Sequence, residues 1–243
     1  MGRTGNYFDI HSHILPGVDD GSPNMDTTLQ MLRQAMEQNI STMIATPHYR
    51  AGGENTPVSE LMRIRDQVQV EAQKMNQDFQ LLLGNELLYS ESILDALKSG
   101  DALTLAGSRY VLVEFGYNED YKNIYNGLGN LVNAGYLPIL AHIERYKCLH
   151  RKIELLEELV ELGCCLQMNS NSLLGNIFTD AGYNRQLVYR RLIQFIGSDC
   201  HDSEVRVPRM EAVAEIFRKK RKIRLIHLLL RENPSKILEN SYL

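Results

Sequence analysis

The sequence predicts one α/β domain, a (β/α) barrel with seven strands that spans residues 1–243. Two observations predict this fold. Short apolar runs of strand length alternate with segments of helical periodicity, and this alternation indicates parallel strands covered by helices. Histidine, aspartate or glutamate follows the end of most runs. The carboxyl ends of the strands meet on one face of a barrel, whereas an open sheet would scatter its edge strands.

Seven strand-like runs follow one another along the chain, each bounded by polar residues or glycine. They are Tyr7–Ile10, Thr42–Ala45, Phe79–Leu83, Tyr110–Val113, Leu137–Ala141, Cys164–Met168 and Gln194–Ile196. Between them, apolar residues at spacings of three and four predict helices over 61–75, near Leu29 and near Ile153. The same spacing recurs in 203–243, where we expect helices that pack on the outside of the barrel and a short last helix after Pro234.

The composition is that of a soluble globular protein. The chain has 26 Lys and Arg against 30 Asp and Glu, and this net charge of −4 gives no reason to expect a nucleic acid partner. No apolar run approaches the ~20 residues of a spanning helix and the start MGRTGN is polar, so we expect a cytoplasmic protein without membrane insertion. The four cysteines form no C-x-x-C pair and are expected to be core residues.

Two histidines end the first run, in the segment DIHSHILPGVDDGS. Because alternate side chains of a strand face the same side, His11 and His13 can point at one place while Ser12 faces away. Each position alone is a weak signal, since His48 could cap a turn and His142 could be a core histidine. Together, five of the seven histidines and several carboxylates end apolar runs, where a lone charge is costly to bury. Metal ions offset this cost, and imidazole with carboxylate suits zinc, manganese or iron.

These residues lie in segments that resemble the PHP (polymerase and histidinol phosphatase) superfamily and, within it, the CpsB/CapC-type bacterial tyrosine-protein phosphatases. The matching segments are, in order, DIHSHILPGVDDGS, TPHY, GNE, VEF, AHIERY and GSDCHD followed by Arg206. They extend over residues 9–206, and the first is the most specific. The resemblance implies a PHP-type distorted (β/α)7 barrel with three divalent metal ions, manganese foremost, with iron, zinc or magnesium as alternatives.

Carried onto this sequence residue by residue, the resemblance implies three groups of metal ligands. His11, His13, Glu86 and Asp199 would hold the first ion, Glu86, Glu114 and His142 the second, and Asp20, His48 and His201 the third. Spacing leaves Asp19 and Asp20 equally open as the ligand, and the family pattern points to Asp20. Cys200 stands where a small residue such as alanine is frequent in the family.

The charges of this ligand set suit phosphoryl transfer. Three divalent ions would carry more positive charge than the four carboxylates neutralise, so the site would attract phosphate and stabilise hydroxide. We therefore expect direct attack on phosphorus by a metal-bridging hydroxide. Arg145 and Arg206 are the expected catalytic residues that bind the phosphoryl oxygens, although either could be a surface arginine. A phenolate leaves readily, so Asp202 is only a weak candidate for a general acid.

Cys200 and Arg206 also spell C-x5-R, the signature of cysteine-dependent tyrosine phosphatases. The five residues between them include two carboxylates and no glycine, which makes a poor anion nest. Asp199, directly before the cysteine, disfavours a thiolate. We therefore reject a cysteine nucleophile.

The substrate class follows from the resemblance alone. It implies a phosphotyrosine-containing protein, the tail of a membrane tyrosine autokinase that controls capsule or exopolysaccharide synthesis. The polar loops 50–56 and 116–126 are expected to form the rim of the site. Five tyrosines could stack on the substrate ring or be ordinary rim residues: Tyr49, Tyr117, Tyr121, Tyr125 and Tyr146. A small-molecule phosphoesterase such as histidinol phosphatase and a non-catalytic regulatory barrel are the alternatives, and homo-oligomer formation is left open.

Overall fold

The strands form two parallel sheets. The computed structural model describes residues 6–175 and 180–243. The first sheet contains β1 (Tyr7–Ser12), β2 (Ile40–Ala45) and β4 (Gln80–Leu83). The second contains, in spatial order, β3 (His48–Arg50), β5 (Glu86–Leu88), β6 (Tyr110–Glu114), β7 (Leu137–Leu140), β8 (Cys165–Asn169) and β9 (Phe195–Gly197). All neighbouring strands run parallel, as the alternation of strands and helices predicts.

The two sheets are parts of one distorted barrel. β3 continues β2 after a bend of two residues, and β5 continues β4 in the same way. Hydrogen bonding carries on across these bends, because the Glu86 N–H donates to the Pro47 carbonyl at 3.2 Å. At the other side, Ser12 pairs with Cys200 in an isolated parallel bridge, which brings the last strand beside the first. The seven predicted strands are confirmed. The short extensions β3 and β5 were not predicted, because three residues with polar ends carry little strand signal.

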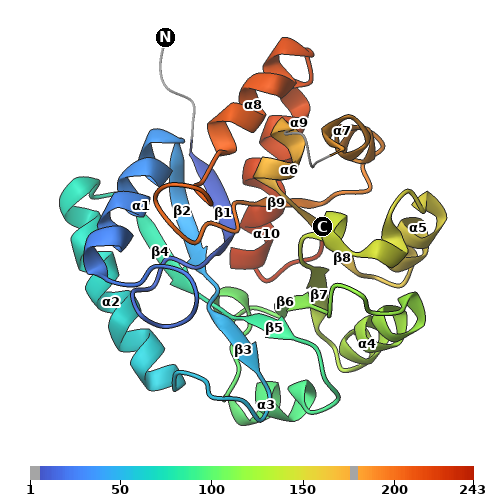
Figure 1. Ribbon diagram of the computed structural model, residues 1–243, viewed down its shortest axis with the longest axis horizontal. Coiled ribbons are helices and arrows are strands. Elements are labelled where there is room, and N and C mark those ends of the chain that lie inside the picture. The colour runs from blue at the N-terminus through green and yellow to red at the C-terminus, as the bar shows by residue number, and fades with distance from the viewer. Residues whose placement is uncertain (1–5, 176–179) are drawn as a thin grey trace.

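Helices surround the strands (Figure 1). The longer ones are α1 (Met25–Glu37), α2 (Val58–Met75), α4 (Tyr121–Asn133), α5 (Ile153–Glu161), α7 (Ala181–Tyr189) and α8 (Met210–Lys219). The shorter ones are α3 (Ile93–Ser99), α6 (Ser170–Leu174), α9 (Ile223–His227), α10 (Asn233–Leu238), the 3-10 turns η1 (Leu105–Gly107), η2 (Ile143–Arg145) and η3 (Lys147–Leu149), and the π-helical segment η4 (Leu228–Glu232). The expected loop over 116–126 is wrong in its second half, since α4 begins at Tyr121 and buries Ile124 against the barrel.

An inner apolar core takes side chains from β1, β2, β4, β6, β7, β8 and β9. Its residues are Ile10, Ile44, Leu82, Leu105, Tyr110, Leu112, Ile139, Cys165, Phe195 and Ile237, with a few neighbours. Ile237 belongs to α10, and the residues after this helix bind the start of β6, where the Tyr110 hydroxyl donates to the Ser241 carbonyl at 2.8 Å. The expectation that the C-terminal helices pack on the outside therefore fails for α10, because Ile237 fills the barrel at the amino ends of its strands.

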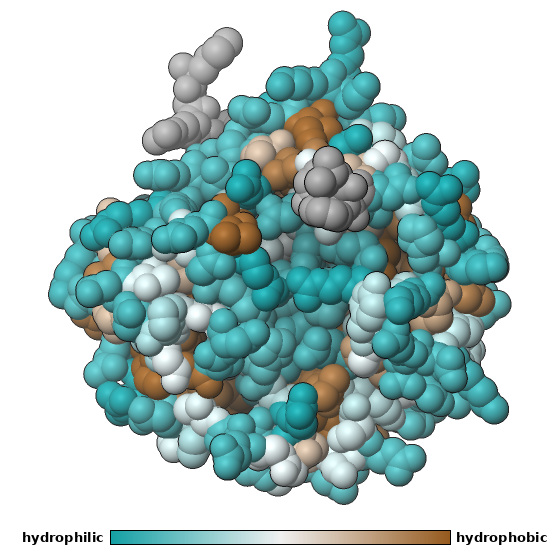
Figure 2. Space-filling model, viewed as in Figure 1, coloured by the Kyte–Doolittle hydropathy of each residue, from teal (hydrophilic) through white to brown (hydrophobic). Residues whose placement is uncertain are grey.

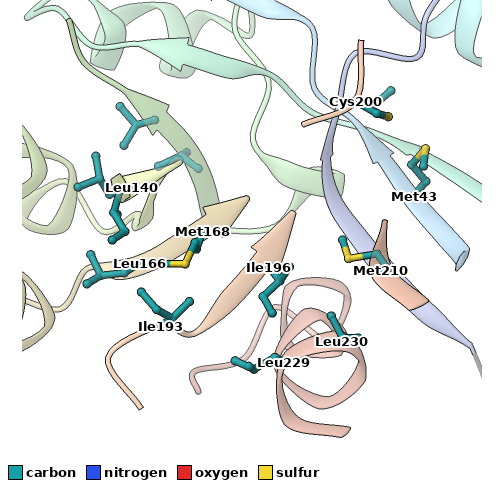
Figure 3. Close-up of a cluster of buried hydrophobic side chains, with 14 of the residues drawn as sticks. Met43, Leu140, Leu166, Met168, Ile193, Ile196, Cys200, Met210, Leu229 and Leu230 are labelled. Carbon is teal, nitrogen blue, oxygen red and sulfur yellow. The ribbon is translucent and has the colours of Figure 1, made fainter. Parts of the chain in front are cut away.

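An outer apolar core lies between the strands and the helices. Figure 3 shows part of it, with Met43, Leu140, Leu166, Met168, Ile193, Ile196, Cys200, Met210, Leu229 and Leu230. Alternate residues of a strand face opposite sides, so while Leu166 and Met168 of β8 pack outward, Gln167 and Asn169 face inward. The interior is therefore apolar at the amino ends of the strands and polar at their carboxyl ends. Figure 2 shows one face of the molecule, which is hydrophilic and hollowed near its middle.

Candidate metal centre

The two histidines at the end of β1 point at one place. His11 Nε2 lies 3.2 Å from His13 Nε2, and both side chains are buried. Ser12 faces the other way, where its hydroxyl donates to the Ile44 carbonyl at 2.9 Å. The pairing of β1 with β2 is irregular between Asp9 and Ser12, where the strand changes from packing apolar side chains to presenting imidazoles.

Two carboxylates from distant strands join the two imidazoles. Glu86, at the start of β5, places Oε2 3.2 Å from both His11 Nε2 and His13 Nε2. Asp199, after β9, places Oδ1 3.4 Å from His11 Nε2 and 3.5 Å from His13 Nε2. All four side chains are buried. These are the four residues expected to hold the first ion.

The hydrogen bonds on the far side of each imidazole show that this donor set fits a cation. His11 Nδ1 faces Gln167 Oε1 at 3.3 Å, and His13 Nδ1 faces Asp19 Oδ2 at 2.7 Å. Both partners are acceptors, so they favour a proton on each Nδ1 and leave each Nε2 facing the other ring and two carboxylate oxygens. Once a metal ion replaces the protons held here, two imidazole nitrogens and two carboxylate oxygens are available to it as ligands.

A second group lies beside the first. His48 Nδ1 is 3.2 Å from Glu86 Oε2 and 3.3 Å from Glu114 Oε1. His142 Nε2 is 2.8 Å from Glu86 Oε1 and 3.5 Å from Glu114 Oε2. Glu86 therefore presents one oxygen to each side, as a bridging carboxylate would.

A third group contains Asp20 and two further histidines. Asp20 Oδ1 lies 3.3 Å from His48 Nε2 and 3.5 Å from His201 Nε2, and its side chain is 66% exposed. His13 also lies close enough to share an ion with these three residues. Asp19 instead accepts from the His13 ring and from the Gly21 and His48 N–H groups, so it orients other residues. The geometry favours Asp20, as the family pattern does.

Without cations, the carboxylates keep protons on some of these imidazoles. Burial alone would lower the pKa of His13, but hydrogen bonds to Asp19 and Glu86 raise it to about 10. Burial would also lower the pKa of His142, but hydrogen bonds to Glu114 and Glu86 outweigh burial and raise this pKa to about 9. Burial and the nearby His13 lower the pKa of His201 to about 4, although Asp199 and Asp20 oppose this shift. A metal ion must therefore displace protons from this site.

The backbone is strained at two of the expected ligands. His142 has a φ of 33° and Asp199 a φ of 52°, in the left-handed region that non-glycine residues avoid. Gly21 is required by close approach, because a Cβ there would lie 2.2 Å from the His13 carbonyl oxygen. Strained backbone held in place by its surroundings is typical of functional sites.

Both predicted arginines reach the outer oxygen of Asp199. Arg145 Nη2 lies 2.5 Å and Arg206 Nη2 2.8 Å from Asp199 Oδ2, to which Asn169 Nδ2 also donates at 2.7 Å. The arginine side chains are 43% and 36% exposed, so each guanidinium keeps donors free at the mouth of the site. Neither arginine is an isolated surface residue.

Sequence reasoning missed two residues on β8. Gln167 Oε1 accepts from His11 Nδ1 and, at 2.7 Å, from the His142 N–H, while its Nε2 donates to Asn169 Oδ1 at 2.9 Å. Asn169 in turn donates to Asp199, so one chain of hydrogen bonds connects three expected ligands. Two polar residues at i and i+2 in an otherwise apolar strand were the available signal.

The structure disfavours both Cys200, rejected above as a nucleophile, and Asp202, the weak candidate for a general acid. Cys200 is fully buried in the outer core, and burial raises the pKa of its thiol. Asp202 Oδ1 accepts from the N–H groups of Glu204, Val205 and Arg206, so its carboxylate holds the loop. Partial burial opposes this effect, but these hydrogen bonds lower the pKa of Asp202 and disfavour its use as an acid.

A cavity of about 450 Å³ opens beside His48 and Glu114. It is lined further by Val18, Asp19, Asp20, Tyr49, Arg50, Gly53, Glu54, Asn55, Thr56 and Leu88, so the loop 50–56 does form part of the rim. Of the five rim tyrosines, Tyr49 lines this cavity and the other four do not. Tyr146 is buried, with its hydroxyl accepting from the Phe115 N–H, Tyr121 and Tyr125 lie on α4, and Tyr117 stacks under Lys147.

Comparison with known proteins identifies the family. A family model described as capsular polysaccharide synthesis, CpsB/CapC, matches residues 7–239. The chain belongs to the CpsB/CapC family. The tyrosine-protein phosphatase CpsB of Streptococcus agalactiae is 34% identical to it over 97% of this chain and 100% of that protein. The tyrosine-protein phosphatase YwqE of Bacillus subtilis is 31% identical over 96% of this chain and 92% of that protein.

Solved structures agree with this assignment. The chain is similar to a crystal structure from a study of YwqE from Bacillus subtilis and CpsB from Streptococcus pneumoniae, which it describes as unique metal-dependent tyrosine phosphatases. The TM-score is 0.89 at 30% identity, and the match covers 97% of this chain and 96% of that one. A histidinol phosphate phosphatase of Lactococcus lactis has a TM-score of 0.56 at 14% identity, covering 87% of this chain and 93% of that one. This second likeness concerns the fold alone. None of the helices in the described part of the chain combines the length and apolar character of a membrane span.

Proposed function

We propose that this CpsB/CapC family member is a metal-dependent protein-tyrosine phosphatase of the cytoplasm that acts in capsule or exopolysaccharide synthesis. Its substrate would be a phosphotyrosine-containing protein, the tail of a membrane tyrosine autokinase. The observation that carries this proposal is the convergence of His11 Nε2, His13 Nε2, Glu86 Oε2 and Asp199 Oδ1 on one buried place. Relatives that match nearly the full chain are named tyrosine-protein phosphatases.

Nine side chains would hold three divalent ions, which we propose to be manganese. His11, His13, Glu86 and Asp199 would hold the first ion, Glu86, Glu114 and His142 the second, and Asp20, His48 and His201 the third. His48 also lies near the second group, and His13 lies near the third. When bound, such ions supply the Lewis acidity that activates water and stabilises charge on a phosphoryl group.

The chain's own residues would bind and orient the phosphoryl group. Arg145 and Arg206 flank Asp199 from the solvent side, and each can offer further N–H donors to phosphoryl oxygens. Their contact with Asp199 Oδ2 keeps both guanidinium groups at the mouth of the site before substrate arrives. Charge that develops on the equatorial oxygens is then met by donors already in place.

The cavity beside His48 and Glu114 would take the tyrosine side chain. Val18 and Leu88 offer apolar contact for a phenyl ring, and the rest of the lining is mostly polar. A phenolate with a pKa near 10 leaves with little help from an acid. This fits a site in which the candidate acid Asp202 is committed to holding a loop.

Side-by-side turnover tests the proposal. The purified chain with added manganese should hydrolyse a phosphotyrosyl peptide at least tenfold faster, in kcat/KM, than histidinol phosphate, and chelator should abolish both reactions. Arg206→Ala should reduce kcat/KM for the peptide by about a hundredfold, and Arg206→Lys should recover only part of it, because lysine lacks the planar fork. Faster turnover of histidinol phosphate would favour a small-molecule phosphoesterase. Turnover that survives chelator and Arg206→Ala unchanged would contradict the proposed chemistry.

A further inference from the structure

A basic run joins α8 to α9. Lys or Arg occupies six of the seven positions 218–224, and Ile223 is the exception. The remainder of the chain then has 20 Lys and Arg against 30 Asp and Glu, so the protein is strongly acidic everywhere else. The net charge of −4, from which we expected no polyanionic partner, conceals this separation of charge.

The cations of this run are exposed and most have no acidic partner. Arg218 binds Glu211 at 2.6 Å, and Arg224 binds Glu232. The four cations between them are exposed and make no ion pair with any residue in 6–175 or 180–243: Lys219, Lys220, Arg221 and Lys222. Like charges at successive positions repel one another, so an external anion would relieve an unfavourable arrangement.

The run also borders a small cavity that suits a phosphate group. The cavity has a volume of about 220 Å³ and is lined by Arg191, Arg221, Lys222, Arg224, Tyr189, Leu225 and Leu228. Four cationic side chains thus face one hollow, whose remaining walls are aromatic and apolar. Ile223, the last residue but one of the run, is 57% exposed. Cations around an exposed aliphatic side chain are typical of surfaces that bind anionic lipid bilayers.

The position of the turn leaves the metal centre accessible. Arg218 Nη2 donates to the Tyr7 hydroxyl at 2.8 Å, which places the end of α8 at the start of β1. His11 and His13 lie at the other end of that strand. In Figure 1 the turn from α8 to α9 lies at the edge of the molecule, away from the strands. A flat surface can approach this protruding turn while the opposite end of the barrel faces solution.

We propose that the turn between α8 and α9 is an electrostatic docking surface for an anionic lipid bilayer. A protruding turn fits a flat partner, whereas a peptide or a nucleic acid strand needs an extended groove, and the hollow beside the turn has room for one headgroup only. Lysine side chains on flexible stems suit a fluid array of lipid phosphates better than one fixed ligand geometry. Docking here would hold the protein at the membrane without any spanning segment.

Vesicle sedimentation tests the docking surface. The intact protein should sediment with vesicles of phosphatidylglycerol and phosphatidylcholine at 0.1 M salt, and should stay in solution with phosphatidylcholine alone or at 0.5 M salt. Each cation is worth about fivefold in partitioning, so changing all four unpaired cations to Gln should weaken it at least about a hundredfold. The matched control changes four exposed cations elsewhere to Gln: Arg33, Lys98, Lys122 and Lys152.

The outcomes separate docking from general charge and from misfolding. The control variant carries the same net charge and should bind anionic vesicles nearly as well as the unchanged protein. Hydrolysis of a small aryl phosphate should be equal in all three proteins, which shows that each is folded. Ile223→Ser should weaken the binding that persists at 0.3 M salt. Equal binding of both quadruple variants, or binding to heparin or DNA with none to anionic vesicles, would overturn the proposal.

Discussion

Replacing Gln167 by methionine tests how the metal centre is assembled. The side chains have similar volume, but methionine cannot accept the hydrogen bonds from His11 Nδ1 and from the His142 N–H. Both donors are buried, so each would be left without a partner. The His11 ring would also lose the acceptor that keeps its proton on Nδ1, and with it the free lone pair on Nε2.

The size of the effect follows mainly from the two buried donors left without an acceptor, and the hydrogen bond from Gln167 Nε2 to Asn169 Oδ1 is lost as well. A buried donor without a partner costs about 1–3 kcal/mol, so the metal-free variant should lose about 2–6 kcal/mol of unfolding free energy. Loss of a hydrogen bond that orients a metal ligand typically weakens metal binding by about 10–100-fold. Gln167→Glu keeps an acceptor toward both donors and should retain most of the affinity.

Two measurements on matched variants separate the effect on metal from the effect on stability. Manganese affinity is measured by competition with a chelating dye at pH 7, and stability by urea unfolding in chelator. Gln69→Met is the control, because Gln69 bonds backbone groups of Phe79 and Leu81 in a similar way but lies outside the cluster. It should lose stability and keep its metal affinity. Gln167→Met with unchanged affinity and stability would refute the idea that β8 orients the ligands.

The geometry leads to four further predictions. Gly21→Ala should lower the free energy of unfolding, measured in urea, by about 3 kcal/mol, because the new methyl group meets the His13 backbone. The control Gly52→Ala, where φ is 75° and nothing lies nearby, should lower it by about 1 kcal/mol. Equal losses would be inconsistent with the close contact at Gly21. Manganese binding at pH 7 should release close to two protons, because the pKa of His13 is raised to about 10 and that of His142 to about 9. Calorimetry in buffers of different ionisation enthalpy counts the released protons. Binding without proton release would show that these imidazoles are already neutral. For the same reason the metal-free protein should lose stability as the pH rises from about 6.5 through 10, since these imidazoles give up their protons over that range. Cys200→Ala should keep kcat within about twofold, and a loss of a thousandfold would revive a thiolate mechanism.

Much of the fold was predictable because the strands are apolar and short and the helices are periodic. The start of β6 at Tyr110 and of β7 at Leu137 were predicted to the residue. Local patterns could not reveal what depends on contacts between distant segments. Ile237 packs against residues from several strands, and the helical start at Tyr121 was hidden by the polar residues around it.

The candidate site was predictable to the extent that each group ends a strand. The carboxyl ends of the strands converge in any parallel barrel, so the sequence could indicate which side chains lie close together but not the distances between them. Other roles depend on contacts between distant segments. Asp19 and Asp20 differ only in which way each side chain turns, and Gln167 becomes important only because His11 and His142 lie beside it. No spacing along the chain contains that information.

Anomalous diffraction from crystals grown with manganese tests the central claim most directly. An anomalous peak is predicted within about 2.3 Å of His11 Nε2, His13 Nε2, Glu86 Oε2 and Asp199 Oδ1, with further peaks beside Glu114 and Asp20. A map with no peak among these atoms, or with manganese bound only elsewhere, would contradict the account.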